Sequence, residues 1–238
     1  MVPLQRGRYL ARAAADAGDI AAALDLRARC FRGGTKSDAD AHDRLSRHLL
    51  IEDLGQNRLA ACLRWRWFAD GTGLAGSYAA QFYDLSPLVA YEKPLIEIGR
   101  FCTDSAARDP DLLRLAFACI ARLVDEGEVG MLFGCSSFDG ADPARHAPAL
   151  ARLAPFLGPI ARRPLRLAAE VASIVAGPQG DAPLPPLLKT YLAMGGWVSD
   201  HAVVDRALDT LHVFTGVEIA AIPPARARLL RAMAAESG

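Results

Sequence analysis

Two buried strands joined by a capped helix, between residues 95 and 138, limit the possible folds of this chain most strongly. Leu95 to Thr103 carries the β-branched and aromatic residues that are typical of a buried strand. Asp109 and Pro110 are suited to the first positions of a helix, which leucines at helical spacing continue to about Gly127. Met131 to Phe138 is apolar again and predicts a second strand. A strand, a helix and a strand in this order favour a parallel pair joined by a crossover.

The segments on either side predict further strands and helices. Strands are expected over residues 8–13, 47–53, 59–68 and 211–222. Helices are expected from Asp19 to Phe31, between residues 142 and 157, from 187 to 194 and at the C-terminus. We therefore expect an α/β or α+β fold in which helices flank a mixed sheet. Residues 1–238 should form one domain, with a helical and proline-rich C-terminal portion from about residue 142.

The composition excludes some classes of protein. The 27 basic and 27 acidic residues balance, whereas a dedicated nucleic-acid binder carries a basic excess. The five cysteines are scattered and form no Cys-x-x-Cys pair, which indicates reduced thiols and no zinc site, and we discount Cys102 and Cys135 as nucleophiles. No apolar run reaches the ~18 residues of a membrane span. A cytoplasmic protein is expected, and the arginine-rich final helix is compatible with contact with the inner membrane.

Charged residues interrupt the apolar strand at residues 95–103. Glu97 and Arg100 stand on either side of Gly99, among isoleucines and a phenylalanine. Burying an unpaired charge costs several kcal/mol or more, so both side chains need partners. Glycine in a strand often marks a bulge or a close approach of backbone to a ligand. The segment therefore indicates a working site, and the alternative is a buried ion pair at a sheet edge.

Several segments together resemble one known family. The resemblance covers nearly the whole chain and rests on residues 26–31, 38–43, 47–51, 77–86, 95–102, 132–138 and 211–216. The family is that of the acyl-carrier-protein-dependent N-acyltransferases that begin ornithine-lipid synthesis. It is a branch of the GNAT superfamily, related to the acyl-homoserine lactone synthases.

The resemblance implies an activity and the roles of three residues. The protein would move a 3-hydroxyacyl chain from acyl carrier protein to the α-amine of ornithine, by direct attack of the amine on the thioester. Such a step needs a base and donors for the oxyanion. Glu97 is the candidate base, and Gly99 lies where the GNAT fold has a bulge whose amides face the thioester. Arg100 completes a Glu-x-x-Arg pair of the lactone synthases.

The same comparison implies a pocket for the amino acid. Arg27 with Phe31, and Asp40 with Asp43, match two more residue pairs of the lactone synthases. We expect the arginines and the acidic loop to form an ion-pair network, with Asp40 or Asp43 free to bind a cationic amino acid; Arg64 is a further candidate. The alternative is that these charges only pin the N-terminal loop to the sheet.

The donor site departs from the GNAT pattern. Residues 105–110 contain no glycine where many GNAT enzymes have a glycine-rich pyrophosphate loop. A helix N-terminus and Arg108 are expected to hold the phosphopantetheine of a carrier protein, without a further cofactor or metal. Glutamine or lysine as acceptor, a lactone synthase and a non-catalytic acyl or carrier-protein binding module are the alternatives. Lactone synthases usually have tryptophan in the N-terminal loop, where this chain has Gly33-Gly34-Thr35-Lys36.

Overall fold

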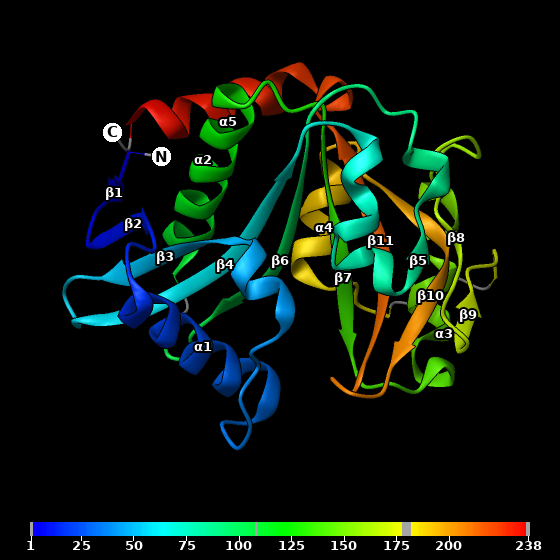
Figure 1. Ribbon diagram of the computed structural model, residues 1–238, viewed down its shortest axis with the longest axis horizontal. Coiled ribbons are helices and arrows are strands. Elements are labelled where there is room, and N and C mark those ends of the chain that lie inside the picture. Colours follow the sequence, from blue (N-terminus) through cyan, green and yellow to red (C-terminus); the bar gives the residue numbers. More distant parts are fainter. Residues whose placement is uncertain (1, 108, 178–181, 237–238) are drawn as a thin grey trace. The chain divides into compact units, whose positions relative to one another are not determined.

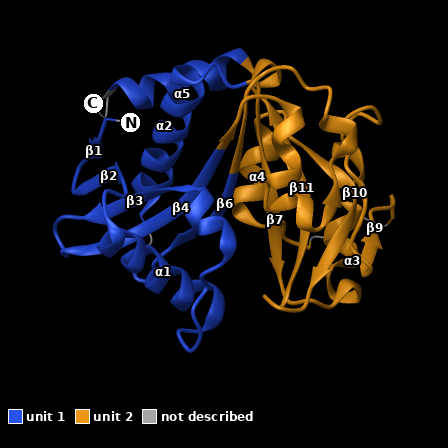
Figure 2. Ribbon diagram, viewed as in Figure 1, with its two compact units in different colours: residues 1–66, 98–129, 224–238 blue, residues 67–97, 130–223 orange. Residues whose placement is uncertain are grey.

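A computed structural model describes residues 2–107, 109–177 and 182–236 of the chain. Its contacts divide the chain into two compact units, which are coloured separately in Figure 2. Unit 1 comprises residues 1–66, 98–129 and 224–238, and unit 2 comprises residues 67–97 and 130–223. The expectation of a single domain stays a prediction. We describe each unit by itself.

Unit 1 contains an antiparallel meander covered by helices. Its strands are β1 (Leu4–Arg6), β2 (Tyr9–Ala13), β3 (Arg47–Asp53) and β4 (Arg58–Phe68), which ends in unit 2. Its helices are α1 (Ala17–Arg32), α2 (Pro110–Glu126) and α5 (Pro224–Glu236), all labelled in Figure 1. Helix α1 packs on the Leu50 and Cys62 face of the strands through Ala23 and Leu26. Helix α5 lies against α2, and Arg231 forms an ion pair with Asp125 at 3.0 Å.

Helix α1 begins earlier than its sequence indicates. The N-cap is Asp16, whose carboxylate accepts a hydrogen bond from the amide of Asp19 at 2.9 Å. Asp19 lies in the first turn, and its own carboxylate accepts hydrogen bonds from Arg12 of β2 at 2.5 and 2.7 Å. A guanidinium partner from a neighbouring strand therefore draws this side chain away from the capping position. The cap of α2 agrees with the sequence, because Asp109 accepts from the amide of Asp111.

Unit 2 contains a sheet in which a parallel pair of strands is followed by antiparallel strands. Strand β6 (Leu95–Thr103) starts in unit 2, and residues 95–97 pair in parallel with residues 131–133 of β7 (Met131–Asp139). β7 then pairs antiparallel with β11 (Thr210–Glu218), followed by β10 (Trp197–Asp205) and β9 (Val171–Ser173). The remaining elements are α3 (Pro143–Ala151), α4 (Pro186–Ala193) and the separate pair of β5 (Tyr83–Asp84) with β8 (Leu165–Arg166). Parallel and antiparallel pairs, with helices on them, confirm the expected mixed fold.

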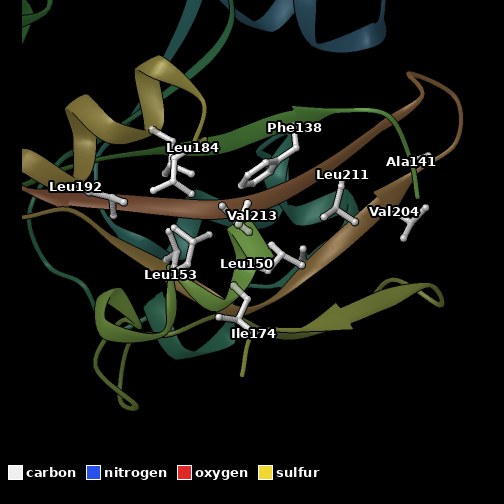
Figure 3. Packing of buried hydrophobic residues seen from close by; sticks show 14 residues of the cluster. Phe138, Ala141, Leu150, Leu153, Ile174, Leu184, Leu192, Val204, Leu211 and Val213 are labelled. Carbon is white, nitrogen blue, oxygen red and sulfur yellow. The ribbon is translucent and has the colours of Figure 1, made fainter. Parts of the chain in front are cut away.

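The larger core of unit 2 joins its sheet to α3 and α4. Leu150 and Leu153 pack with Leu184 and Leu192 around Val213 of β11, as Figure 3 shows. Strand β10 is absent from the sequence prediction because Ser199, Asp200 and His201 interrupt its apolar residues. Ser199 and His201 are nevertheless fully buried. The portion beyond residue 142 is thus richer in strands than its helical and proline-rich sequence indicates.

Within the described ranges, no helix combines the length and the apolar character that crossing a bilayer would require.

Candidate active site

A network of arginines and aspartates in unit 1 is centred on the buried Asp38. One oxygen of Asp38, Oδ2, accepts hydrogen bonds from Nε of Arg27 and from Nε of Arg100, each at 2.9 Å. The side chain of Asp38 is fully buried and that of Arg27 is 1% exposed. Arg27 comes from α1 and Arg100 from β6, so this single carboxylate joins two elements. Charges this deeply buried are tolerated only because each has partners.

Arg64 joins the other two aspartates of the same loop. It forms a bidentate pair with Asp40, with Nη1 to Oδ1 at 2.5 Å and Nη2 to Oδ2 at 2.8 Å. Its Nη1 also donates to Asp43 at 2.7 Å, and Asp43 accepts from Arg27 at 2.5 Å. Paired planar groups of this kind hold both partners in one geometry. The structure therefore brings five residues predicted for the site into one network: Arg27, Asp40, Asp43, Arg64 and Arg100.

The loop between α1 and β3 is shaped to present these carboxylates. Asp40 is the N-cap of a 3₁₀ helix (Ala41–Leu45), accepting from the amide of His42, while Asp43 accepts from the amide of Asp40. This reciprocal arrangement is a capping box and fixes the spacing of the two side chains.

The irregular backbone of β6 lies at Arg100 instead of Gly99. Arg100 has a φ of 53°, in the left-handed region, where a residue with a Cβ pays about 1 kcal/mol. Its hydrogen bond to Asp38 offsets that cost. Gly99 does not have a left-handed backbone conformation. A Cβ placed on it would meet only Nε of Arg64, at 3.9 Å. The glycine therefore leaves space beside the network.

Glu97 lies in unit 2 and holds a neighbouring segment. Its two carboxylate oxygens accept hydrogen bonds from the backbone amides of Tyr78 and Ala79, at 2.9 and 2.8 Å. These amides open the short 3₁₀ helix Ala79–Gln81, and the residue is 7% exposed. Glu97 is thus a buried carboxylate with an anchoring contact, whatever its role in catalysis.

An open cavity of about 800 Å³ lies against the acidic loop. Its lining includes Asp40 and Asp43 together with the apolar side chains of Ile20 and Leu24. The expectation that one of the two aspartates is free is wrong, because both are bound by arginine. Four guanidinium groups surround three carboxylates here, so pairing within the network is the lower-energy state. Asp40 is the most accessible of the three, with 25% of its side chain exposed against 8% for Asp43.

The network of described residues does not include two other residues predicted for the site, Phe31 and Arg108. Phe31 packs in the apolar cluster beneath α1, with Leu50 and Cys62, where it supports the helix. Arg108 lies outside the described residues. The N-terminus of α2 already carries two carboxylates, Asp109 as its cap and Asp111, which pairs with Arg6 at 3.0 Å.

Sequence reasoning did not single out three residues of the network. Besides Asp38, these are Arg32, which lies 3.4 Å from Asp38, and His48, which lies opposite Arg64 in the β3–β4 register. Burial lowers the pKa of His48, which keeps it neutral beside the two arginines. The signal available for Asp38 was the cluster of three aspartates in six residues. Across the described ranges, no group of three or more His, Cys, Asp or Glu side chains is placed to hold a metal ion.

We expect the pKa of the Asp43 carboxylate to cause a measurable loss of stability in acid. Burial alone would raise the pKa of Asp43. Hydrogen bonds from Arg27, the Asp40 amide and Arg64 lower the pKa by more, so that its value is about 2. A pKa below that of the unfolded chain stabilises the fold above pH ~4, and this contribution disappears as the pH falls through about 2. Urea unfolding should therefore show the wild type losing about 2 kcal/mol more than Asp43→Asn between pH 4 and pH 2. Parallel pH curves for the two proteins would contradict the assignment.

Comparison with known proteins agrees with this fold. Residues 27–118, which contain the network, match the family model for an acetyltransferase (GNAT) domain. The solved structure of FeeM, an N-acyl amino acid synthase from uncultured soil microbes, shares the fold with a TM-score of 0.55. It is 11% identical over 90% of this chain and 93% of that chain. The fold is therefore the GNAT fold.

Relatives found by sequence similarity identify a narrower family within the GNAT fold. The L-ornithine N(alpha)-acyltransferase of Rhodobacter capsulatus is 31% identical over 227 residues, which are 86% of this chain and 88% of the relative. The enzyme of the same name from Brucella abortus is 29% identical, over 82% of this chain and 79% of the relative. The chain belongs to the family of the L-ornithine N(alpha)-acyltransferases.

Proposed function

We propose that this protein transfers an acyl chain from a thioester donor to the α-amine of ornithine. The observation that carries the proposal is the similarity, over 86% of the chain, to a relative named for that reaction. The donor in this proposal is a 3-hydroxyacyl chain on the phosphopantetheine of acyl carrier protein, and the product is the lyso-lipid that starts ornithine-lipid synthesis. The enzyme needs no further cofactor in this scheme.

The reaction requires a deprotonated amine and a stabilised oxyanion. The amine nitrogen attacks the thioester carbonyl, a C–N bond forms, the C–S bond breaks, and the thiol leaves with a proton. Glu97 is the proposed base, acting directly or through a water molecule, because it is a buried carboxylate at the start of the irregular part of β6. Backbone amides near Gly99 are the proposed donors to the oxyanion.

The charges of the network suit an amino-acid acceptor. With His48 neutral, the four guanidinium groups exceed the three carboxylates by one positive charge, which favours the α-carboxylate of the substrate. Asp40 is the most accessible carboxylate at the cavity and, while still paired with Arg64, is the proposed second contact of a terminal ammonium. Burial raises the pKa of Asp40 and Arg64 lowers it by more, so Asp40 is ionised at neutral pH.

Contact with the inner membrane from the cytoplasmic side is also proposed. The product is amphiphilic, and α5 exposes the apolar Leu229, 59% accessible, beside the exposed Arg228. A vesicle pull-down with anionic lipid, comparing the wild type with Leu229→Asp, tests this contact. Equal recovery of both proteins would contradict it.

Mass spectrometry of the products tests the proposed reaction. The protein is incubated with 3-hydroxyacyl carrier protein and an equimolar mixture of ornithine, lysine, glutamine and S-adenosylmethionine. N-acyl-ornithine as the main product supports the proposal. N-acyl-glutamine or N-acyl-lysine would overturn the acceptor, an acyl lactone would make the protein a synthase of that class, and an unconsumed thioester would favour a binding role.

The proposed approach of the donor to Gly99 makes a separate prediction. Gly99→Ala should leave stability within about 1 kcal/mol, because the added methyl group meets only Nε of Arg64 at 3.9 Å. The same methyl group would enter the space proposed for the thioester, so kcat/KM should fall about tenfold or more, which corresponds to about 1.4 kcal/mol. Thermal unfolding and initial rates measure the two effects. Unchanged kcat/KM in a folded Gly99→Ala protein would show that the thioester does not bind next to Gly99.

A further inference from the structure

One arginine at the cavity of unit 1 has no part in the arginine–aspartate network. Arg44 lies in the last turn of the 3₁₀ helix Ala41–Leu45 and lines the cavity together with Asp40 and Asp43. The residue is exposed, and among the described residues its side chain has no ion-pair or hydrogen-bond partner. A guanidinium group in this state, beside a cavity, is available to an anionic group of a ligand.

The arginines of the network are not available in the same way. Only 1% of the Arg27 side chain, 4% of Arg64 and 12% of Arg100 are exposed. All three donate hydrogen bonds to aspartates of the acidic loop. Their excess positive charge attracts an anion to the loop, but direct contact with a carboxylate of the ligand falls to Arg44.

The rest of the cavity lining is apolar. Ile20 and Leu24 lie one turn apart on α1, and both are half-buried. The side of α1 that faces the core carries Ala23 and Leu26 instead, which are fully buried. Ile20 and Leu24 therefore present apolar surface to the cavity, and methylene groups of a ligand would remove this surface from water.

The short helix sets the spacing between the two charged contacts. Asp40 is its N-cap and Arg44 follows four residues later, so a rise of ~2 Å per residue separates them by about 8 Å along the axis. The cavity thus offers an anionic contact at one end of the 3₁₀ helix and a cationic contact at the other, together with apolar surface on α1. These three features match an amino acid whose linear side chain ends in an ammonium group.

We infer that Arg44 binds the α-carboxylate of the acceptor and thereby selects amino acids over simple amines. The inference rests on the proposed function, in which the acceptor is ornithine. The guanidinium pairs with the carboxylate, the methylene groups of the side chain lie on Ile20 and Leu24, and the terminal ammonium lies near Asp40. Arg44 is a specificity-determining residue and takes no proton during the transfer.

Isothermal titration calorimetry with three ligands tests this role without turnover. The ligands are L-ornithine, L-norvaline, which lacks the terminal ammonium, and putrescine, which lacks the carboxylate. Arg44→Gln should weaken the binding of ornithine and norvaline about tenfold or more and leave that of putrescine unchanged. Arg44→Lys should restore part of the affinity. The matched control Arg29→Gln, at an arginine of α1 that is exposed and outside the cavity lining, should bind all three ligands as the wild type does.

Two further measurements separate binding from folding. Because Arg44 is exposed and unpaired among the described residues, Arg44→Gln should keep the melting temperature of the wild type. The KM for ornithine should rise by the same factor as the dissociation constant, with little change in kcat. Leu24→Ser should weaken all three ligands, because each carries a methylene chain. Unchanged binding of all three ligands to Leu24→Ser would overturn the placement of the side chain on α1.

The outcomes distinguish this inference from the proposed reaction. If the wild type produces N-acyl-ornithine but Arg44→Gln binds ornithine equally well, the role of Arg44 is overturned and the reaction stands. If Arg44→Gln loses affinity for ornithine but the wild type acylates another acceptor, the binding site is supported and the reaction is overturned. An equal loss of affinity for putrescine would also overturn the inference, because Arg44 would then act through the fold and not through the carboxylate.

Discussion

Replacing Arg27 by methionine is expected to lower the free energy of unfolding by about 3–5 kcal/mol. Arg27 is 1% exposed and binds two carboxylates, Asp38 at 2.8 Å and Asp43 at 2.5 Å. Methionine fills much of the same volume but donates no hydrogen bond, so Asp38 keeps only part of its compensation in a fully buried position. The loss therefore comes mainly from the carboxylates left behind. Urea unfolding at pH 7, followed by far-UV circular dichroism, measures the effect.

Arg29 supplies the matched control for Arg27 in the same helix. Its side chain is 55% exposed, and its guanidinium lies 3.7 Å from Asp104, which makes a weak surface pair. Arg29→Met should change the free energy of unfolding by less than about 1 kcal/mol. If both substitutions cost the same, the network contributes no more than ordinary surface charges, and its description as a buried organising centre fails.

Replacing Glu97 by glutamine is expected to lower kcat by about 10²- to 10⁴-fold. Glutamine keeps the shape of the side chain but cannot take a proton from the ammonium group of the acceptor. A part of the loss can arise from the anchoring role, because the amides of Tyr78 and Ala79 each donate to one oxygen of Glu97. Glutamine offers one acceptor oxygen, so one of these amides would face an NH₂ group.

Separate measurements distinguish the two roles of Glu97. Loss of the anchor lowers thermal stability at every pH, whereas loss of the base removes the rise of kcat with pH and leaves donor binding intact. Glu92→Gln, at an exposed glutamate of the same unit, should behave as wild type in both assays. Near-normal kcat in a folded Glu97→Gln protein would eliminate Glu97 as the base. A flat pH profile in both wild type and variant would assign it a purely structural role.

Local signals in the sequence were sufficient for most elements of the fold. Strand β6, the Asp109 cap and Pro110 start of α2, and β7 were predicted at nearly their observed bounds. The reason is that caps, turns and apolar periodicity act over a few residues and are written in neighbouring positions. The short strands β1, β5, β8 and β9 were not predicted. Asp19 and strand β10 are the more instructive exceptions. In both cases contacts with another element overrode the local pattern, as when Arg12 of β2 binds Asp19 of α1.

The sequence by itself determined which residue types are present at the site: a glutamate, a glycine and an arginine in one strand, and three aspartates in one loop. Only the tertiary structure decided how these charges are paired. Asp38 and Arg100 are 62 residues apart in the chain, yet they share a hydrogen bond of 2.9 Å. It also placed the left-handed backbone at Arg100, next to the bulge expected at Gly99, and it paired both Asp40 and Asp43, one of which was expected to be free. Pairing energies depend on distance and burial in space, which no spacing along a single chain encodes.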